Sequence, residues 1–309
     1  MDCGTNSIRL LVADVSGSVL TDVHREMRVV RLGQGVDRTG ELAPDALDRT
    51  RLALVDYART CRELDVAAVR MVATSATRDA RNRAEFVSMV REVLGVAPEV
   101  VSGDEEAALS FDGATRGLDP ADGPFLVMDI GGGSTELVLG DGTRVVGRSV
   151  DVGCVRLTER HLADDPPTAA QVAAAEADID AGLSLIREVV PVARARTVIG
   201  LAGSVTTVAA FALDLPAYDA TRTHLARLPA EQAVAAARQL LAMSSADRAA
   251  LPFMHPGRVD VIGAGALVLA VLLERLGSPE LLVSEADILD GIAWSVAARQ
   301  PGTTERGRT

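Results

Sequence analysis

Residues 1–15 read MDCGTNSIRLLVADV and residues 125–141 read FLVMDIGGGSTELVLGD, and the two stretches share one pattern. In each, an aspartate opens a short loop of glycine and small polar residues, and an apolar strand follows; Asp129 comes 127 residues after Asp2. Each strand then reaches a glycine-containing turn typical of a β-hairpin, followed by another predicted strand. Two loop–hairpin–strand units in the same order indicate a duplicated domain.

The segments after each unit alternate between predicted strands and predicted helices. In the first half, residues 66–76 and 97–101 read as strands, whereas residues 78–95 and the segment from Ser102 read as helices. The second half repeats this alternation and ends with a strand that runs into a final helix. The pattern predicts an α/β fold.

Residues 117–124 (GLDPADGP) contain the glycine, proline and aspartate of a linker, so we place a domain boundary there. The two loops are expected to face each other across a cleft between the domains. The expected organisation is an N-terminal domain, a C-terminal domain, a final helix and a disordered tail, at residues 1–119, 120–285, 286–300 and 301–309.

The composition indicates a globular protein that is not built for membranes or nucleic acids. Hydrophobic residues make up 48% of the 309-residue chain, but no run is long enough to span a membrane and the N-terminus does not resemble a signal peptide. A formal net charge of −12 argues against nucleic-acid binding. Cys3, Cys61 and Cys154 are scattered without metal-ligand spacing, as expected of reduced thiols in a cytoplasmic protein.

The paired loops suggest phosphate binding. Glycines allow backbone N–H groups to converge on an anion, and an aspartate at a strand end can hold Mg²⁺ directly or through water. One such loop alone would be read as a simple turn, but a symmetric pair favours a phosphate clamp. The chain contains no lysine, which excludes a P-loop, so arginine, backbone amides or a metal must contact any phosphate. Arg9 and Glu136 occupy equivalent places in the repeats with opposite charge, so one could contact phosphate and the other a metal.

The helix that begins in VVSGDEEAAL contains two adjacent glutamates with different interpretations. Ser102 and Glu105 form the pattern of a capping box, which gives Glu105 a structural explanation. Glu106 has no such explanation and lies one turn from the helix start, where it could act as a general base toward water. The alternative is that Glu106 is an ordinary exposed helix residue.

Two further segments are candidates for phosphate contact. Arg78 follows a predicted strand and begins a helix, where the macrodipole disfavours a cation unless an anion lies nearby. The segment GLAGSVTTVAA, residues 200–210, also follows a strand and opens a helix. Its helix N-terminus could bind an anion, or Ser204 could be only the N-cap.

The first loop has little chain behind it, because only Met1 precedes Asp2, whereas PFLVM precedes Asp129. We expect so short a strand to hold Asp2 loosely and to place an α-amino group beside a metal site. On this basis we expect the native chain to start further upstream.

Six segments together resemble the successive motifs of the exopolyphosphatase and guanosine pentaphosphate phosphatase family: DCGTNSIRLLVADV, VATSATRDARN, VVSGDEEAALSF, VMDIGGGSTELVLG, DVGCVRLTE and GLAGSVTTVAA. That family belongs to the actin, sugar kinase and Hsp70 superfamily, and this chain resembles its short, two-domain form. The resemblance implies two duplicated RNase H-like domains around a central cleft, with the last helix packing back on the first domain. It also implies Mg²⁺ as cofactor, with Mn²⁺ as an alternative, and a homodimer as the assembly to test.

The resemblance also implies roles for individual residues. Glu106 would be the base that activates the attacking water, and Asp129 and Glu136 would hold Mg²⁺. The residues contacting phosphate would be Asn6, Ser7, Arg78, Gly131, Gly132, Gly133 and Ser134. Leu289 stands where the family often has an arginine, so that phosphate contact is not carried over.

The activity implied by the resemblance is that of an exopolyphosphatase, which hydrolyses the terminal phosphoanhydride bond of inorganic polyphosphate and releases orthophosphate. A guanosine pentaphosphate 5′-phosphatase shares the same motifs and is the first alternative. The second alternative is a non-catalytic regulator that senses polyphosphate or an alarmone. Glu106 and the paired aspartate loops argue against the regulator.

Overall fold

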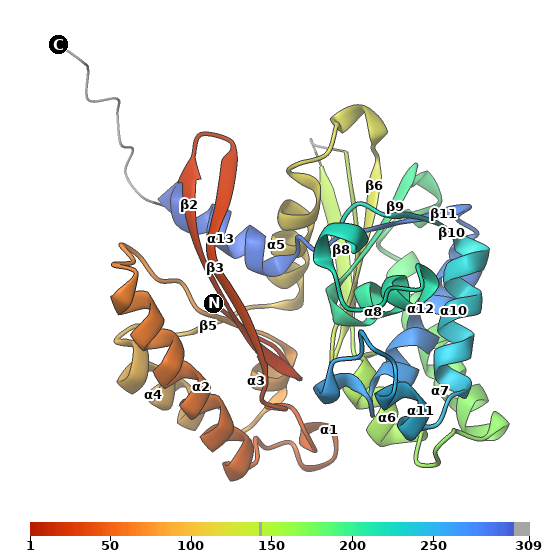
Figure 1. Ribbon diagram of the computed structural model, residues 1–309, viewed down its shortest axis with the longest axis horizontal. Helices are drawn as coiled ribbons and strands as arrows, with labels where there is room; N and C mark the ends of the chain where they lie inside the picture. The colour runs from red at the N-terminus through yellow and green to blue at the C-terminus, as the bar shows by residue number, and fades with distance from the viewer. Residues whose placement is uncertain (142–143, 300–309) are drawn as a thin grey trace.

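The computed structural model describes residues 1–141 and 144–299, which form two β-sheets with helices packed around them (Figure 1). The first sheet has the order β3-β2-β1-β4-β5 and the second has the order β10-β11-β9-β6-β7-β8. The strands of the first sheet are β1 (Asp2–Cys3), β2 (Ser7–Ser16), β3 (Val19–Val29), β4 (Val72–Ala73) and β5 (Glu99–Val100). Those of the second are β6 (Phe125–Ile130), β7 (Thr135–Gly140), β8 (Val145–Val150), β9 (Thr197–Leu201), β10 (Arg227–Pro229) and β11 (Glu280–Val283). The predicted α/β fold is confirmed.

The two sheets contain the same unit, as the repeat in the sequence predicts. In each, a central strand pairs antiparallel with the strand of a hairpin on one side and parallel with a later strand on the other. Asp2 lies opposite Arg9 in the first sheet, and Asp129 lies opposite Glu136 in the second. The expected equivalence of Arg9 and Glu136 is therefore confirmed at the level of strand register.

Helices surround both sheets, and α12 lies at the centre of the larger second core. Nearly every residue of α12 is buried, because α6, α7, α8 and α10 pack around it. The helices before β6 are α1 (Val36–Thr39), α2 (Pro44–Glu63), α3 (Ser75–Asp79), α4 (Arg83–Leu94) and α5 (Gly103–Thr115). The later ones are α6 (Cys154–His161), α7 (Ala169–Arg187), α8 (Ala202–Ala212), α9 (Ala220–Thr223), α10 (Ala230–Ala242), α11 (Ser245–Ala249), α12 (Ile262–Leu276) and α13 (Ile288–Arg299). None of the helices in the described part of the chain combines the length and apolarity that a membrane crossing needs.

Helices α5 and α13 pack against each other between the two sheets (Figure 1). Helix α5 contacts β6, β7 and β8 of the second sheet, whereas α13 contacts β1 and β2 of the first. Their backbones meet at glycines, since a Cβ on Gly113 would lie 1.9 Å from the carbonyl oxygen of Asp287 and one on Gly291 would lie 2.0 Å from that of Leu109. This close crossing joins the two halves of the molecule and fixes the helix that carries Glu106.

The prediction of one helix over residues 78–95 is wrong in one respect, because two helices, α3 and α4, occupy this segment. Helix α3 begins inside the stretch predicted as strand, so β4 is short, and the chain becomes extended at Ala80. The N–H of Arg81 donates to the carbonyl of Gly40 at 2.9 Å. The Asn82 side chain pairs with both backbone groups of Leu42, at 2.8 and 3.0 Å. These long-range bonds replace the helical ones.

The expectation that Asp2 is loosely held is wrong. Asp2 is 3% exposed, and its Oδ2 accepts bonds from Nε and Nη2 of Arg9 at 2.9 and 2.6 Å. The α-amino group of Met1 donates to the carbonyl of Arg70 at 2.7 Å, and burial lowers its pKa to about 6. Pairing of β1 with strands on both sides, together with these side-chain bonds, compensates for its length. The tail expected to be disordered, residues 301–309, lies outside the described residues.

The close crossing of α5 and α13 predicts that Gly113→Ala is destabilising, although alanine favours a helix more than glycine does. The added methyl must displace backbone atoms of Asp287, so we expect a loss of about 3 kcal/mol in the free energy of unfolding. Chemical denaturation measures this loss. Gly117→Ala is the matched control, because a Cβ there meets nothing within 4 Å. Equal stabilities of the two variants would contradict the proposed crossing.

Candidate active site

A cavity of about 120 Å³ lies between the two glycine-containing loops. The loops pack against each other directly, since a Cβ on Gly132 would lie 2.8 Å from Cβ of Thr5 and one on Gly133 would lie 2.7 Å from its Oγ1. The expected face-to-face arrangement of the loops is confirmed. Among the residues that line the cavity are Asp2, Thr5, Asn6, Ser7, Arg9, Glu106, Asp129, Gly131, Gly132, Ser134, Gly203 and Arg258.

Each loop is closed by the same backbone hydrogen bond. The N–H of Gly4 donates to the carbonyl of Ser7 at 2.9 Å, and the N–H of Gly131 donates to the carbonyl of Ser134 at 3.0 Å. These pairs are related by the repeat distance of the sequence. The two loops therefore share one conformation despite their different residues.

The carbonyls of both loops are bound by chain segments outside the cavity. The carbonyl of Asn6 accepts bonds from the N–H groups of Val30 and Arg31, and that of Gly132 accepts bonds from those of Val155 and Arg156 at the start of α6. Within the described ranges, the N–H groups of Asn6 and Gly132 have no hydrogen-bond partner. Because no described group of the protein accepts a bond from them, these N–H groups are available to an anion in the cavity.

Glu106 lies at the cavity wall, where α5 holds it against the second sheet. It is 7% exposed, and its Oε2 accepts a hydrogen bond from Nη1 of Arg78 at 2.9 Å. Burial raises the pKa of Glu106 to about 7, and the carboxylates of Asp129 and Asp2 act in the same direction, whereas Arg78 lowers it. A buried carboxyl group with such a pKa is suited to accept a proton near neutral pH.

Glu105 has a different environment, as the sequence predicts. Its N–H donates to Oγ of Ser102 at 3.2 Å, which is half of the expected capping box. The Glu105 carboxylate does not complete the box, because it pairs with Nη2 of Arg70 at 3.0 Å. Glu105 thus pairs with a buried arginine of the first domain and does not line the cavity.

Four carboxylates lie at the cavity or next to it, namely those of Asp2, Glu106, Asp129 and Glu136. Asp129 is 7% exposed and accepts a hydrogen bond from Oγ of Ser110 at 2.6 Å, and burial raises its pKa to about 6. Glu136 is 1% exposed and bonded to Ser149 at 2.6 Å; burial raises its pKa, and Glu106 and Asp129 add to the shift. Glu136 pairs with Asp129 across the strands but does not line the cavity.

The donor set fits a divalent cation that keeps most of its water. Oδ1 of Asp2 is buried and, within the described ranges, has no hydrogen-bond partner, and Asp2 lines the cavity with Asp129. The described residues contain no group of three or more histidine, cysteine, aspartate or glutamate side chains close enough to enclose a metal. Mg²⁺ is commonly held by one or two carboxylates with water completing the shell, and this arrangement suits such binding.

The third glycine-rich segment forms another part of the cavity wall at the start of α8. The interpretation of Ser204 as the N-cap is wrong, because α8 begins at Ala202 and Ser204 lies within its first turn. Ala202 has φ of 68°, a left-handed conformation that is strained for a residue with a side chain. This turn brings the helix N-terminus to the cavity, where Ala202, Gly203 and Ser204 all contribute to the lining.

Two arginines line the cavity, of which the repeat in the sequence offered Arg9 as a possible phosphate contact and did not point to Arg258. Arg9 pairs with Asp2 at 2.6 Å and also with Asp287, so its charge is shared between two buried carboxylates. Arg258 donates to Gly203 O at 3.3 Å and to Oγ1 of Thr207 at 3.1 Å, and among the described residues it forms no ion pair. The absence of lysine left arginine, backbone amides or a metal to contact phosphate, but nothing in the sequence around Arg258 connects it with the loops.

The predicted site residues are thus mostly brought together. Seven of them line the cavity, namely Asn6, Ser7, Glu106, Asp129, Gly131, Gly132 and Ser134. Gly133 lies behind the loop and packs against Thr5 and Ser75. Arg78 contacts Glu106 and the carbonyl of Val101, so the structure places it on the predicted base and not on the cavity wall.

Two duplicated α/β domains that enclose a cavity of loop amides and buried carboxylates define a protein of the actin-like class that acts on phosphate groups. Comparison with known proteins makes this more specific. The model of the Ppx/GppA phosphatase family matches residues 11–300, so the chain belongs to this family, and the resemblance read from the motifs is confirmed.

Individual relatives cover nearly the whole chain. Exopolyphosphatase 2 of Mycobacterium tuberculosis is 52% identical over 96% of this chain and 97% of its own length. A crystal structure of an exopolyphosphatase-like protein is 43% identical and has a TM-score of 0.93, covering 96% of this chain and 98% of that one. The crystal structure of the Aquifex aeolicus family member is 28% identical with a TM-score of 0.80, covering 98% and 97% of the two chains.

Proposed function

We propose that this protein is an exopolyphosphatase, which releases orthophosphate from the end of inorganic polyphosphate. The observation that carries the proposal is the buried carboxyl group of Glu106 at a cavity formed by two anion-binding loops. Membership of a phosphatase family and the name of the M. tuberculosis relative support it. The small cavity suits one terminal phosphate group, as an enzyme that acts on chain ends requires.

The chain's own residues account for binding and proton transfer. The N–H groups of both loops and the α8 N-terminus bind the terminal phosphate, and Arg258 adds positive charge. Glu106 accepts the proton of a water that attacks the phosphorus in line with the leaving phosphate. Arg78 orients the Glu106 carboxylate and favours its ionised form by lowering its pKa. No covalent intermediate is needed, because positioning and charge neutralisation carry most phosphoryl-transfer catalysis.

The carboxylates of Asp2 and Asp129 would hold Mg²⁺, or Mn²⁺, with Glu136 behind them. When bound, the metal would neutralise charge on the phosphate oxygens. Without a cation these carboxylates would repel a polyanionic substrate. The repulsion would be strong, because the carboxylates are buried in a medium of low dielectric. We therefore propose that the activity requires a divalent metal.

We further propose a cytoplasmic, homodimeric protein. Its three cysteines are free and buried, which suits a reducing compartment. The homodimer rests on the family resemblance alone, and sedimentation of the purified protein tests it.

Glu106→Gln is expected to lower kcat for phosphate release by about 10²–10⁴-fold, because the amide cannot accept the proton of water. Release of orthophosphate from tripolyphosphate and from long polyphosphate with Mg²⁺ measures this loss. Glu105→Gln is the matched control and should keep nearly full activity. Full activity of Glu106→Gln on every substrate would refute the base assignment.

A wild-type protein without activity in Mg²⁺ or Mn²⁺ would favour the non-catalytic regulator instead. A chelator that leaves the rate of phosphate release unchanged would contradict the metal requirement.

The pH dependence tests the role of Arg78. The base must be ionised, so kcat/KM should rise with pH as Glu106 loses its proton. Arg78 lowers the pKa of Glu106, so Arg78→Ala should move the rise toward higher pH, and Arg78→Lys should move it less. An unchanged profile with a raised KM would show that Arg78 contacts phosphate and does not tune the base.

A second candidate, guanosine pentaphosphate 5′-phosphatase, is favoured by a larger cavity beside the first. This cavity, of about 950 Å³, shares Arg9, Ala202, Gly203 and Arg258 with the phosphate cavity. Its lining includes Tyr218, His224, Phe253 and the carboxylate of Glu285, which accepts a bond from Tyr218 OH at 2.7 Å. Aromatic side chains beside a carboxylate suit a nucleobase better than a polyphosphate chain.

Tyr218→Ala distinguishes the two substrates. Loss of a stacking surface should raise KM for guanosine pentaphosphate by about tenfold, whereas KM for tripolyphosphate should change little. Steady-state phosphate release with each substrate gives both values. Equal changes for the two substrates would contradict a nucleoside site in the larger cavity.

A further inference from the structure

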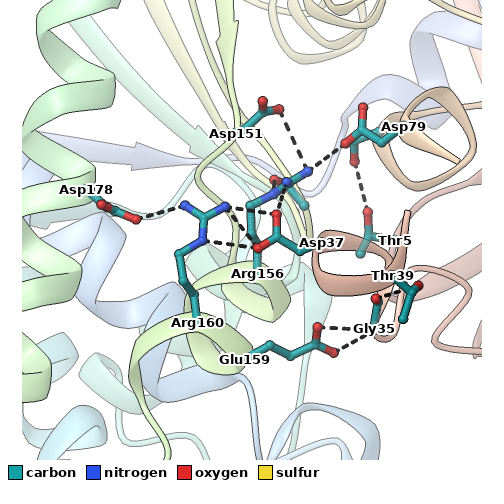
Figure 2. Close-up of polar contacts among 12 residues, drawn as sticks. Thr5, Gly35, Asp37, Thr39, Asp79, Asp151, Arg156, Glu159, Arg160 and Asp178 are labelled. Atoms are coloured by element: carbon teal, nitrogen blue, oxygen red, sulfur yellow. Dashed lines mark hydrogen bonds and ion pairs between the residues drawn. The ribbon is translucent and has the colours of Figure 1, made fainter. Parts of the chain in front are cut away.

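Helix α6 presents a row of charged side chains to the first domain. Arg156, Glu159 and Arg160 are spaced i, i+3 and i+4, so they lie on one face of the helix. Figure 2 shows this face pointing toward Asp37 of α1 and Asp79 of α3. None of these side chains lines the phosphate cavity.

Arg156 connects three separate segments through one guanidinium. Its Nε donates to the carbonyl of Gly133 in the second phosphate loop at 2.8 Å. Its Nη1 donates to Asp37, and its Nη2 donates to Oδ2 of Asp79 at 2.7 Å. The side chain is 12% exposed, so these bonds are largely shielded from water. One arginine thus fixes a carbonyl of the loop to two carboxylates of the other domain.

The neighbouring residues of α6 extend this contact. Nη2 of Arg160 lies 2.9 Å from Oδ1 of Asp37, and the carboxylate of Glu159 accepts the N–H of Gly35 at 3.0 and 3.2 Å (Figure 2). In the first domain, the partners of these three α6 side chains are Gly35, Asp37 and Asp79. We call these six residues, Gly35, Asp37, Asp79, Arg156, Glu159 and Arg160, the interdomain network.

The network reaches the chemistry through α3. Asp79 follows Arg78, whose guanidinium binds Glu106. Ser75, at the other end of α3, bonds Oγ1 of Thr5 in the first loop at 2.9 Å. Only about 10 Å³ of free space remains where Thr5, Ala76, Gly133 and Arg156 meet. A rotation of one domain away from the other would break these contacts together and move the second loop relative to Arg78.

We propose that the interdomain network holds the two domains closed and that Arg156 is a positioning residue that couples closure to the second phosphate loop. Weakening the network would populate a more open arrangement in which the loops no longer face each other. A ligand that binds the closed arrangement must then supply the free energy of closure. Its apparent affinity is its affinity for the closed arrangement multiplied by the fraction of molecules that are closed. This inference rests on the proposed function only for its kinetic readout.

The test removes the first-domain charges and leaves Arg156 and its bond to Gly133 in place. Asp37→Asn with Asp79→Asn is the test variant, and Asp180→Asn is the matched control, because Asp180 pairs with Arg275 inside the second domain. Nitroxide labels on Leu52→Cys in α2 and Leu185→Cys in α7 report the interdomain distance by pulsed spin resonance. Both positions are exposed, and the native cysteines are buried.

We expect the double variant to shift the distance distribution to longer values, while the control matches the parent. We also expect it to weaken orthophosphate binding in calorimetry with Mg²⁺ and to raise KM, each by about tenfold, with kcat nearly unchanged. An unchanged distance distribution would overturn the proposal, as would longer distances with unchanged phosphate affinity. If the wild type released no phosphate from polyphosphate, the proposed function would fail, whereas distances and phosphate binding would still decide the role of the network.

Discussion

The concentration of buried carboxylates at the meeting of the two sheets is the constraint on which the rest of the structure depends. Asp2, Glu106 and Asp129 all line one small cavity, and the buried Glu136 lies opposite Asp129 on the neighbouring strand. Burial and mutual repulsion raise the pKa values of Glu106, Asp129 and Glu136, so their charge must be balanced locally. The hydroxyl groups of Ser110 and Ser149 and the guanidinium groups of Arg9 and Arg78 supply that balance, and each comes from a different element.

The duplication explains how this arrangement arises from simple parts. Each copy contributes a central strand, a loop closed by one backbone bond and a hairpin. Two copies facing each other therefore present the N–H groups of Asn6 and Gly132, which have no partner in the described part of the chain. The two copies differ in the residue that lies opposite the loop aspartate on the neighbouring strand. Arg9 in the first copy neutralises Asp2 and Asp287, whereas Glu136 at the same register adds negative charge beside Asp129. The repeat thus pairs the two loops, and the difference at this position places an arginine beside Asp2 and a glutamate beside Asp129.

Much of the site could be predicted because its residues are local to short motifs. Glu106 was separated from Glu105 by a capping argument alone, and in the structure Glu106 is buried against Arg78 whereas the more exposed Glu105 pairs with Arg70. Arg258 and the role of Arg78 could not be predicted in this way. Arg258 reaches the cavity only through the fold of the second domain, and the contact of Arg78 with Glu106 joins residues far apart in sequence. The break between α3 and α4 has the same origin, since Gly40 and Leu42 outcompete helical bonds.

The sequence by itself determined the duplicated α/β fold, the two paired glycine-containing loops, the distinction between Glu106 and Glu105 and the exclusion of a lysine-based phosphate site. These follow from hydrophobic periodicity, glycine conformational freedom and helix capping, which act over a few residues. Only the tertiary structure decided how charge is distributed. Whether Arg9, Arg78 or Arg156 meets a substrate, a base or another domain depends on which carboxylate the fold brings within hydrogen-bond distance, because electrostatic energies change steeply with separation and burial.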